Sequence, residues 1–220
     1  MPRITRLKPS KRRSGWCNLH LDGAFGFRLP LRLVDRDALA VDGELSDAEV
    51  KSLQSEAESQ GALDRALGYL SYRPRSRFEV ERHLRAKGYG VSAVASALDR
   101  CAGQGYIDDR EFAATFARDR FRLRPRAPAL IELELRKRGV RSEHAREGID
   151  RALVDERVTE MDLALRAARK GFRSLGAAGT RDEETVRRRL YAYLDRRGFR
   201  RDEAAGALEE VLREAASNLE

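Results

Sequence analysis

Clusters of arginine are the residues of this chain whose types and spacing could do chemistry. A guanidinium group is planar and donates hydrogen bonds in pairs, a geometry that matches phosphate and carboxylate groups. We therefore expect an anionic partner, either a nucleic acid or an acidic protein surface. Compositional bias is the alternative explanation, since arginine outnumbers lysine 38 to 6 along the whole chain. The candidate binding residues are Arg73, Arg75, Arg77, Arg82, Arg118, Arg120, Arg122, Arg124, Arg126, Lys170 and Arg173.

The adjacent carboxylates Asp108 and Asp109 allow a second reading, as a metal site or an acid pair. Helix capping is the better explanation, because both stand where a helix is expected to begin. There a carboxylate accepts backbone N–H groups that the helix leaves unpaired and complements the helix dipole. The preceding Tyr106 and Ile107 are then expected to pack one repeated unit against the next.

No arrangement of residues indicates catalysis. His20, His83 and His144 lie far apart in the sequence, and no cysteine or carboxylate stands at metal-ligand spacing from them. The chain has no glycine-rich phosphate loop followed by lysine. We expect a protein that is not an enzyme and that needs no cofactor or metal.

Composition favours a reduced, cytoplasmic protein. The 220 residues carry a net charge of +8, and 41% of them are hydrophobic. No segment has the ~20 consecutive apolar residues that cross a membrane, and the start lacks the apolar stretch of a signal peptide. Cys17 and Cys101 fit no disulfide framework. We expect a monomer without membrane contact.

A repeated pattern, Leu-x-x-(Lys/Arg)-Gly-apolar, positions the arginine clusters. It occurs three times, with offsets of 51 and 59 residues, and the residues at its leucine and glycine are Leu84 and Gly88, Leu135 and Gly139, and Leu194 and Gly198. Glycine suits the left-handed backbone position that follows a helix. Apolar residues at three- and four-residue steps surround each copy and indicate three helices per copy.

These repeats predict a mainly α-helical chain with three tandem three-helix units in an elongated array. We expect the units at 61–109, 110–160 and 161–220. A basic arm, 1–14, and an extension, 15–60, should precede them. In each unit, we expect basic residues in the loop between its first two helices.

The extension should contain a β-hairpin and a helix. Asp22 and Gly23 separate two strand-like segments, and Asp-Gly is typical of a tight hairpin turn. The hairpin should pack on a helix or on a third strand near Ile4 to Leu7. Ser46 and Glu49 form a capping-box pattern, which predicts a helix to about Gln60, before a separate helix from Leu63 to Tyr72. Ser76 and Glu79 repeat the capping-box pattern.

The segment 105–113, Gly-Tyr-Ile-Asp-Asp-Arg-Glu-Phe-Ala, resembles the RecX family of recombinase regulators. The segment 73–79 resembles the first-repeat pattern of that family, and Leu135 to Gly139 resembles its second. The hairpin resembles the N-terminal extension of many members. One departure is Arg126-Ala127-Pro128, where members often have a Lys-Gly pair.

This resemblance implies tandem three-helix units and a role in regulating DNA repair, recombination and the SOS response. It implies binding to the RecA recombinase and to RecA filaments on single-stranded DNA. Through that contact the protein would inhibit the ATPase and strand-exchange activities of RecA. The partner would therefore be the RecA filament, with possible direct contact to its DNA.

Two other functions fit the same residues. Three-helix units with basic loops also occur in proteins that bind DNA on their own, and the basic N-terminus could contact phosphates. Steep salt dependence would favour such a stand-alone DNA-binding protein. An adaptor with unrelated partners is the third hypothesis.

Overall fold

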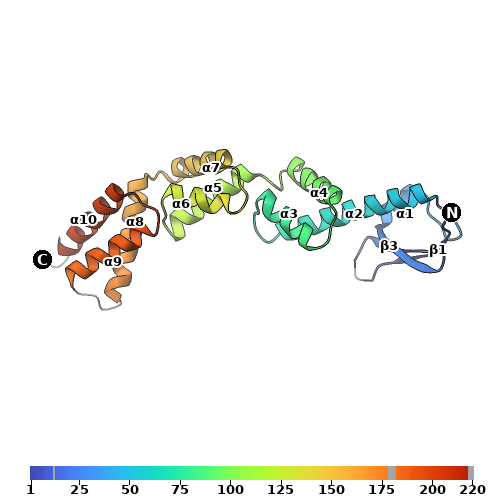
Figure 1. Cartoon of the computed structure of the whole chain (residues 1–220), viewed down its shortest axis with the longest axis horizontal. Helices are drawn as coiled ribbons and strands as arrows, with labels where there is room; N and C mark the ends of the chain where they lie inside the picture. The colour runs from blue at the N-terminus through green and yellow to red at the C-terminus, as the bar shows by residue number, and fades with distance from the viewer. Residues whose placement is uncertain (12, 178–181, 218–220) are drawn as a thin grey trace. The chain divides into compact units, whose positions relative to one another are not determined.

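The computed structural model describes residues 1–11, 13–177 and 182–217. It divides into two compact units, Met1–Ile107 and Asp108–Glu220. The first contains the strands and the first three-helix group, and the second contains the other two groups (Figure 1). The mainly helical fold with a small N-terminal sheet is confirmed.

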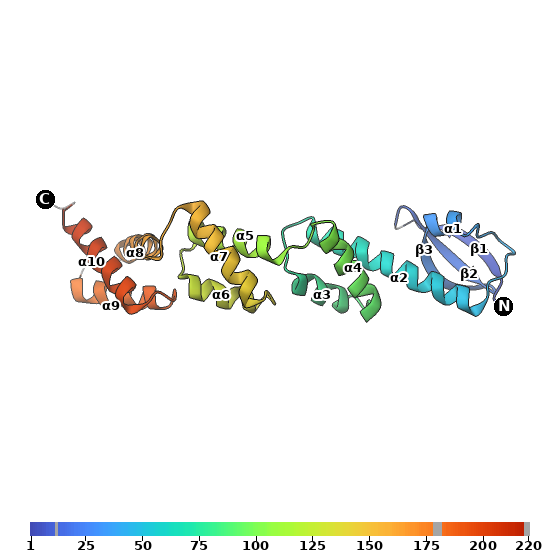
Figure 2. The same ribbon diagram turned by 90° about the horizontal axis from the view of Figure 1, so that it is seen from above.

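The N-terminal sheet has three antiparallel strands in the order β1-β2-β3 (Figure 2). The strands are β1 Ile4–Pro9, β2 Trp16–Leu21 and β3 Ala24–Pro30. The predicted hairpin turn is present, because Asp22 and Gly23 have φ of 49° and 81°. The segment expected to be a basic arm contains β1, which pairs with β2 and buries Ile4. A third strand was the alternative, and pairing with β2 explains why this charged segment is ordered.

Helix α1, Leu31–Arg36, follows β3, and helix α2, Asp47–Leu70, packs its first half on the sheet. The prediction of a helix end near Gln60 and a second helix from Leu63 is wrong, because α2 is continuous. Gly61 lies inside α2, where a side chain would stand 3.3 Å from the Tyr89 ring. The Tyr89 hydroxyl donates a hydrogen bond to the Gly61 carbonyl at 3.0 Å. Gly61 therefore serves close packing, and the boundary predicted between 60 and 61 falls within one helix.

The three-helix groups follow the repeat. The first contains the second half of α2, with α3 Arg77–Ala86 and α4 Val91–Gly103. The second contains α5 Asp109–Leu123, α6 Pro128–Arg136 and α7 Ser142–Glu156. The third contains α8 Glu160–Ala177, α9 Glu183–Asp195 and α10 Arg201–Ser217.

The repeated pattern has the same local geometry in each group. Its leucines, Leu84, Leu135 and Leu194, are fully buried. Its glycines have φ between 76° and 85°, the left-handed region in which a Cβ is strained. The pattern therefore ends the middle helix of each group and inserts one leucine into the core.

Small residues let the first and third helices of each group approach closely. Ala62, Ala113 and Ala164 recur at an offset of 51 on the first helices, and all are fully buried. On the third helices the equivalent positions hold Ala97, Gly148 and Ala207, also buried. The crossing of α5 and α7 is close, since a Cβ on Gly148 would meet the Ala113 Cβ at 2.6 Å.

Local caps begin the helices where the sequence predicts them. The capping boxes of Ser46 with Glu49 and of Ser76 with Glu79 are both present. Helix α6 has no side-chain cap at Ala127, where the chain departs from the family pattern. The Ala127 amide instead donates to the Arg197 carbonyl of the third group at 3.0 Å. The second and third groups share one hydrophobic core, whereas the first group and the sheet each have their own.

Candidate binding surfaces

The arginines before α3 are partly used within the first group. Arg73 donates to the Pro74 carbonyl at 2.9 Å and to the Glu79 carboxylate at 3.2 Å. Arg77 forms an ion pair with Asp99 at 2.7 Å. The guanidinium of Arg75 lies over the Tyr69 ring at 4.1 Å. Their first role is therefore to hold the loop and α3 in place.

Arg82 stands apart from this loop on α3 and is exposed. Its guanidinium lies 5.7 Å from the centre of the Phe78 ring, which is 41% exposed. Within the described residues, Arg82 has no hydrogen bond or ion pair. It remains available to a partner.

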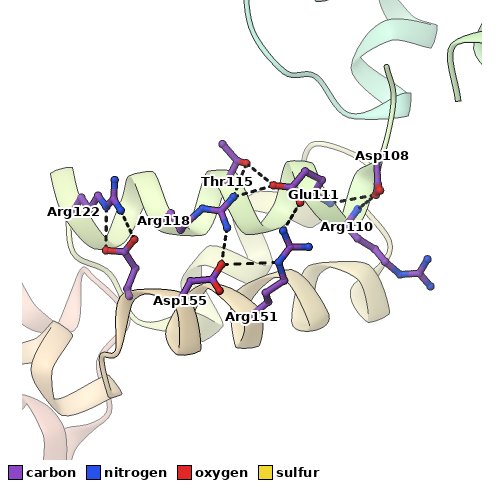
Figure 3. A network of polar contacts seen from close by, with 9 residues as sticks. Asp108, Arg110, Glu111, Thr115, Arg118, Arg122, Arg151 and Asp155 are labelled. Atoms are coloured by element: carbon purple, nitrogen blue, oxygen red, sulfur yellow. Dashed lines mark hydrogen bonds and ion pairs between the residues drawn. The ribbon is translucent and has the colours of Figure 1, made fainter. Parts of the chain in front are cut away.

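Asp108 caps α5, as the sequence predicts. Its carboxylate accepts the backbone N–H groups of Arg110 and Glu111 at 2.8 and 3.1 Å (Figure 3). Asp109 is the first residue of α5. Ile107 is buried in the core of the first group, but Tyr106 is 56% exposed. The role expected of Tyr106, packing one repeated unit against the next, stays a prediction.

Arg118 and Arg122 tie α5 to α7. Arg118 contacts Glu111 at 2.9 Å and Asp155 at 2.8 Å, and Arg151 of α7 reaches the same two carboxylates (Figure 3). Arg122 donates two hydrogen bonds to Glu156, at 3.0 and 2.6 Å. These two arginines satisfy acids of their own group, so they are committed to the fold.

Arg120 and Arg126 share one carboxylate, that of Glu134 on α6. Arg120 donates to it at 3.0 Å, and Arg126 also forms an ion pair with it. Burial, together with the charges of Arg120, Arg197 and Arg124, lowers the pKa of Arg126. This cluster therefore concentrates positive charge around one acid that is 18% exposed.

Arg124 and Arg173 are exposed, and their side chains have no hydrogen bond or ion pair with any part of the chain that the structure describes. Lys170 donates to the Leu123 carbonyl at 2.9 Å and caps the end of α5. Lys170 and Arg173 were expected in the loop between the first two helices of the third group. That placement is wrong, because α8 continues to Ala177 and carries both residues. Part of the predicted loop, 178–181, lies outside the described residues.

A groove in the first unit brings together residues that sequence reasoning did not connect. It has a volume of about 590 Å³ and is lined by the sheet side, α2 and α3. Its lining residues are Arg13, Arg28, Asp64, Arg65, Gly68, Tyr69, Tyr72, His83 and Tyr89. Arg28 is the one basic residue of β3, and it is 37 residues from Arg65 in the sequence. The two arginines line the same groove because α2 packs on the sheet. In the sequence, this surface is indicated by Tyr72, a tyrosine that stands beside Arg73 and Pro74 where a loop is expected.

The described residues contain no cluster of three or more histidine, cysteine, aspartate or glutamate side chains able to hold a metal ion. Both cysteines are free and buried. None of the described helices combines the length and apolar character needed to cross a membrane.

In the third group, the carboxyl of Glu160 lies within hydrogen-bond distance of the carboxyl of Glu203. Burial, a hydrogen bond with Glu203 and the charge of Glu203 raise the pKa of Glu160. The folded state therefore holds the Glu160 proton more tightly than the unfolded state does. The protonated Glu160 therefore stabilises the folded state. This stabilisation is fully present below the pKa of Glu160 in the unfolded state and is lost as the pH rises through its pKa in the folded state.

Glu160→Gln is expected to make the protein more stable than the parent at pH 7, because it removes this penalty. The difference should vanish as the pH falls below about 4.3, the ordinary pKa of glutamate. Urea unfolding of both proteins at pH 7 and pH 4 measures it. Glu183→Gln, at the exposed first turn of α9, is the control and should not gain stability at pH 7. A Glu160→Gln midpoint below that of the parent at pH 7 would refute the assignment.

Comparisons with known proteins agree with this arrangement of three-helix groups. The model of the first three-helix domain of RecX matches residues 62–101, and the model of the second matches residues 108–149. The first match covers the end of α2 with α3 and α4, and the second covers α5, α6 and the first half of α7.

Similar proteins extend the match to most of the chain. Regulatory protein RecX of Bacillus licheniformis is 28% identical over 211 residues, which are 96% of this chain and 78% of that protein. Regulatory protein RecX of Bacillus subtilis is 26% identical over the same shares. The protein of that name from Lactobacillus johnsonii is 31% identical over 140 residues, 64% of this chain and 51% of its own length.

Two solved structures have the same fold. A crystal structure of regulatory protein RecX has a TM-score of 0.68 at 24% identity and covers 96% of this chain and 100% of its own. RecX from Lactobacillus salivarius has a TM-score of 0.56 at 22% identity, with 70% and 96% covered. With the two domain matches in sequence order and relatives spanning nearly the whole chain, the protein belongs to the RecX family.

Proposed function

We propose that this protein binds RecA and RecA filaments on single-stranded DNA, and that it inhibits the ATPase, recombinase and strand-exchange activities of RecA. It acts in the cytoplasm, as a monomer and by binding rather than by catalysis. Membership of the RecX family carries this proposal, because the resemblance to that family implies a RecA partner. Relatives whose alignments cover 96% of this chain, at 28% and 26% identity, are named regulatory proteins.

The repeated groups support a polymeric partner. A filament presents many identical protomers, and three similar groups in one chain can contact more than one of them. Linked contacts of this kind raise the overall affinity without any new contact type. Bridging neighbouring protomers would restrict the movement between them that ATP hydrolysis and DNA exchange require.

Three of the candidate residues remain available for this contact. Arg82, Arg124 and Arg173 are exposed, one in each three-helix group, and make no hydrogen bond or ion pair with the described residues. The other candidate arginines of the second group, Arg118, Arg120, Arg122 and Arg126, pair with acids of that group. We therefore expect these three arginines to contact acidic groups of RecA.

The protein is expected to lower the single-stranded-DNA-dependent ATPase rate of the cognate RecA at substoichiometric ratios. The triple variant Arg82→Ala/Arg124→Ala/Arg173→Ala should need about tenfold more protein for half-inhibition, since three exposed ion pairs are worth about 0.5 kcal/mol each. A coupled ATPase assay with titrated protein measures both.

The matched control is Arg136→Ala/Arg201→Ala, which removes exposed arginines that we do not assign to the contact. It should inhibit as the parent does. A RecA ATPase rate that stays unchanged at equimolar amounts of this protein would contradict the proposal. Binding to DNA alone that falls steeply with salt, without any effect on RecA, would favour the stand-alone DNA-binding protein instead.

A further inference from the structure

The groove of the first unit differs from the other candidate surfaces, because basic and aromatic side chains meet in it. Arg28 comes from β3, Arg65 and Tyr69 from α2, Tyr72 from the turn that follows, and His83 from α3. Four elements thus line one cavity of about 590 Å³.

The one acid of the groove is already neutralised. Asp64 accepts a hydrogen bond from Arg13 at 2.8 Å, from the Trp16 indole at 3.2 Å and from Gln60 at 2.6 Å. The Arg13 guanidinium also lies over the Trp16 ring at 3.8 Å. Arg13 and Asp64 therefore form part of the wall that joins the sheet to α2.

The other two arginines of the groove are free to bind a ligand. Arg28 and Arg65 are exposed, and neither has a hydrogen bond or ion pair with the residues that the structure describes. Burial, the larger cause, and the positive charges of Lys87, Arg65 and Arg75, which lie near His83, together lower the pKa of its ring. An anion in the groove could pair with the guanidinium groups of Arg28 and Arg65, and no unpaired carboxylate of the groove lining would repel it.

Tyr72 offers an open planar face to the same cavity, whereas the Tyr69 ring is already covered by His83 and the Arg75 guanidinium. Tyr72 is 85% exposed, although a tyrosine ring in solvent gains nothing for the fold. The rings of Tyr69 and His83 stack in parallel, with 3.9 Å between their centres. A partner that carries both flat rings and negative charges fits this lining, whereas an acidic peptide would leave Tyr72 unused.

We propose that this groove is a binding site for unpaired nucleotides of single-stranded nucleic acid, in which Arg28 and Arg65 contact phosphates and Tyr72 stacks on a base. Sites of this type combine a positive groove with aromatic stacking platforms and tolerate any sequence. Binding at this site does not require RecA, so its test is independent of the function proposed above.

The test uses the full-length protein and a fluorescein-labelled oligodeoxythymidine, with binding followed by fluorescence anisotropy at several salt concentrations. Tyr72→Ala is expected to weaken binding by about fivefold to 150-fold, the equivalent of about 1–3 kcal/mol for one stacked base. Arg28→Ala/Arg65→Ala should reduce the slope of log affinity against log salt by about 1.4, because each single-strand phosphate contact contributes about 0.7.

Matched controls separate the groove from general charge and surface effects. Tyr106→Ala removes another exposed tyrosine, and Arg136→Ala/Arg201→Ala removes two exposed arginines outside the groove. Both should bind the oligonucleotide as the parent does. Circular dichroism and thermal unfolding should show every variant folded, because the substituted side chains are exposed.

A second readout reports on the groove directly. The pKa of His83, followed by NMR, is expected to rise when the oligonucleotide is added, because phosphates offset the charges of Arg65, Arg75 and Lys87. Unchanged affinity in the Tyr72 and arginine variants would overturn the proposal. So would an unchanged His83 pKa at saturation, or equally strong competition by a poly-glutamate peptide, which would identify an acidic-peptide site instead.

Discussion

Gly148→Leu is expected to unfold the second three-helix group, with a loss of about 4 kcal/mol or more in the free energy of unfolding. Gly148 lies where α7 crosses α5, and a Cβ there would stand 2.6 Å from the Ala113 Cβ and 2.7 Å from the Ala114 amide nitrogen. Neither atom belongs to a flexible chain end, so the two helices must separate. Because the second and third groups share one core, the damage should extend to both.

The smaller change Gly148→Ala makes the test sharper. Alanine is favoured over glycine in a helix interior by about 1 kcal/mol, so local propensity predicts stabilisation. The close approach to α5 predicts the opposite sign. Gly176→Ala on α8 is the control, since nothing lies within 4 Å of its added Cβ, and it should be neutral or stabilising. Urea unfolding followed by circular dichroism measures all three variants, and a Gly148→Leu midpoint equal to that of the parent would disprove the tight crossing.

Glu134→Gln is expected to cost about 2–4 kcal/mol, because it leaves two partly buried guanidinium groups without their counter-charge. Arg120 and Arg126 are 25% and 28% exposed and both pair with this carboxylate. The charges of Arg124 and Arg197 add to the unfavourable field at Arg126. An amide of the same size keeps the shape of Glu134 and removes only the charge, so the loss reports on electrostatics.

Glu132→Gln, two residues earlier on α6, is the matched control. The Glu132 side chain is 21% exposed, close to that of Glu134, but its one partner Arg146 is 69% exposed and keeps its hydration when the charge of Glu132 is removed. We therefore expect a loss of about 0–1 kcal/mol. The double variant Glu134→Gln/Arg126→Met should recover part of the lost stability, because it removes one of the stranded charges. Thermal unfolding of the parent, the Glu134→Gln and Arg126→Met single variants and the double variant provides the double-mutant cycle, and Glu132→Gln is measured beside them. A Glu134→Gln loss no larger than that of Glu132→Gln would mean that the cluster is held by packing alone.

Both predictions depend on contacts between residues of different structural elements, and this is where sequence reasoning was least informative. The spacing of basic residues indicated three comparable arginine loops. In the structure, Arg118 and Arg122 pair with α7, and Arg120 and Arg126 share an acid of α6. Whether an arginine is free or paired depends on which carboxylates the packing brings within about 3 Å, and no local pattern records that.

The helix boundaries also divide into those set by neighbouring residues and those set by tertiary packing. The capping boxes at Ser46 and Ser76 and the carboxylate cap at Asp108 were found correctly, since each cap satisfies backbone groups only two or three residues away. Gly61 was misread as a helix end. Glycine both ends helices and permits close packing, and only the position of Tyr89 against α2 distinguishes the two roles.

The sequence by itself determined the repeated unit: the buried leucine, the left-handed glycine and the helix caps all depend on residues within one or two turns of each other. It therefore also determined the family. The tertiary structure alone decided that α2 joins the extension to the first three-helix group and which arginines remain unpaired. It also decided that Arg28 and Arg65 share one groove. Those features arise from side chains brought together across tens of residues, where packing and charge pairing, rather than local backbone preference, set the outcome.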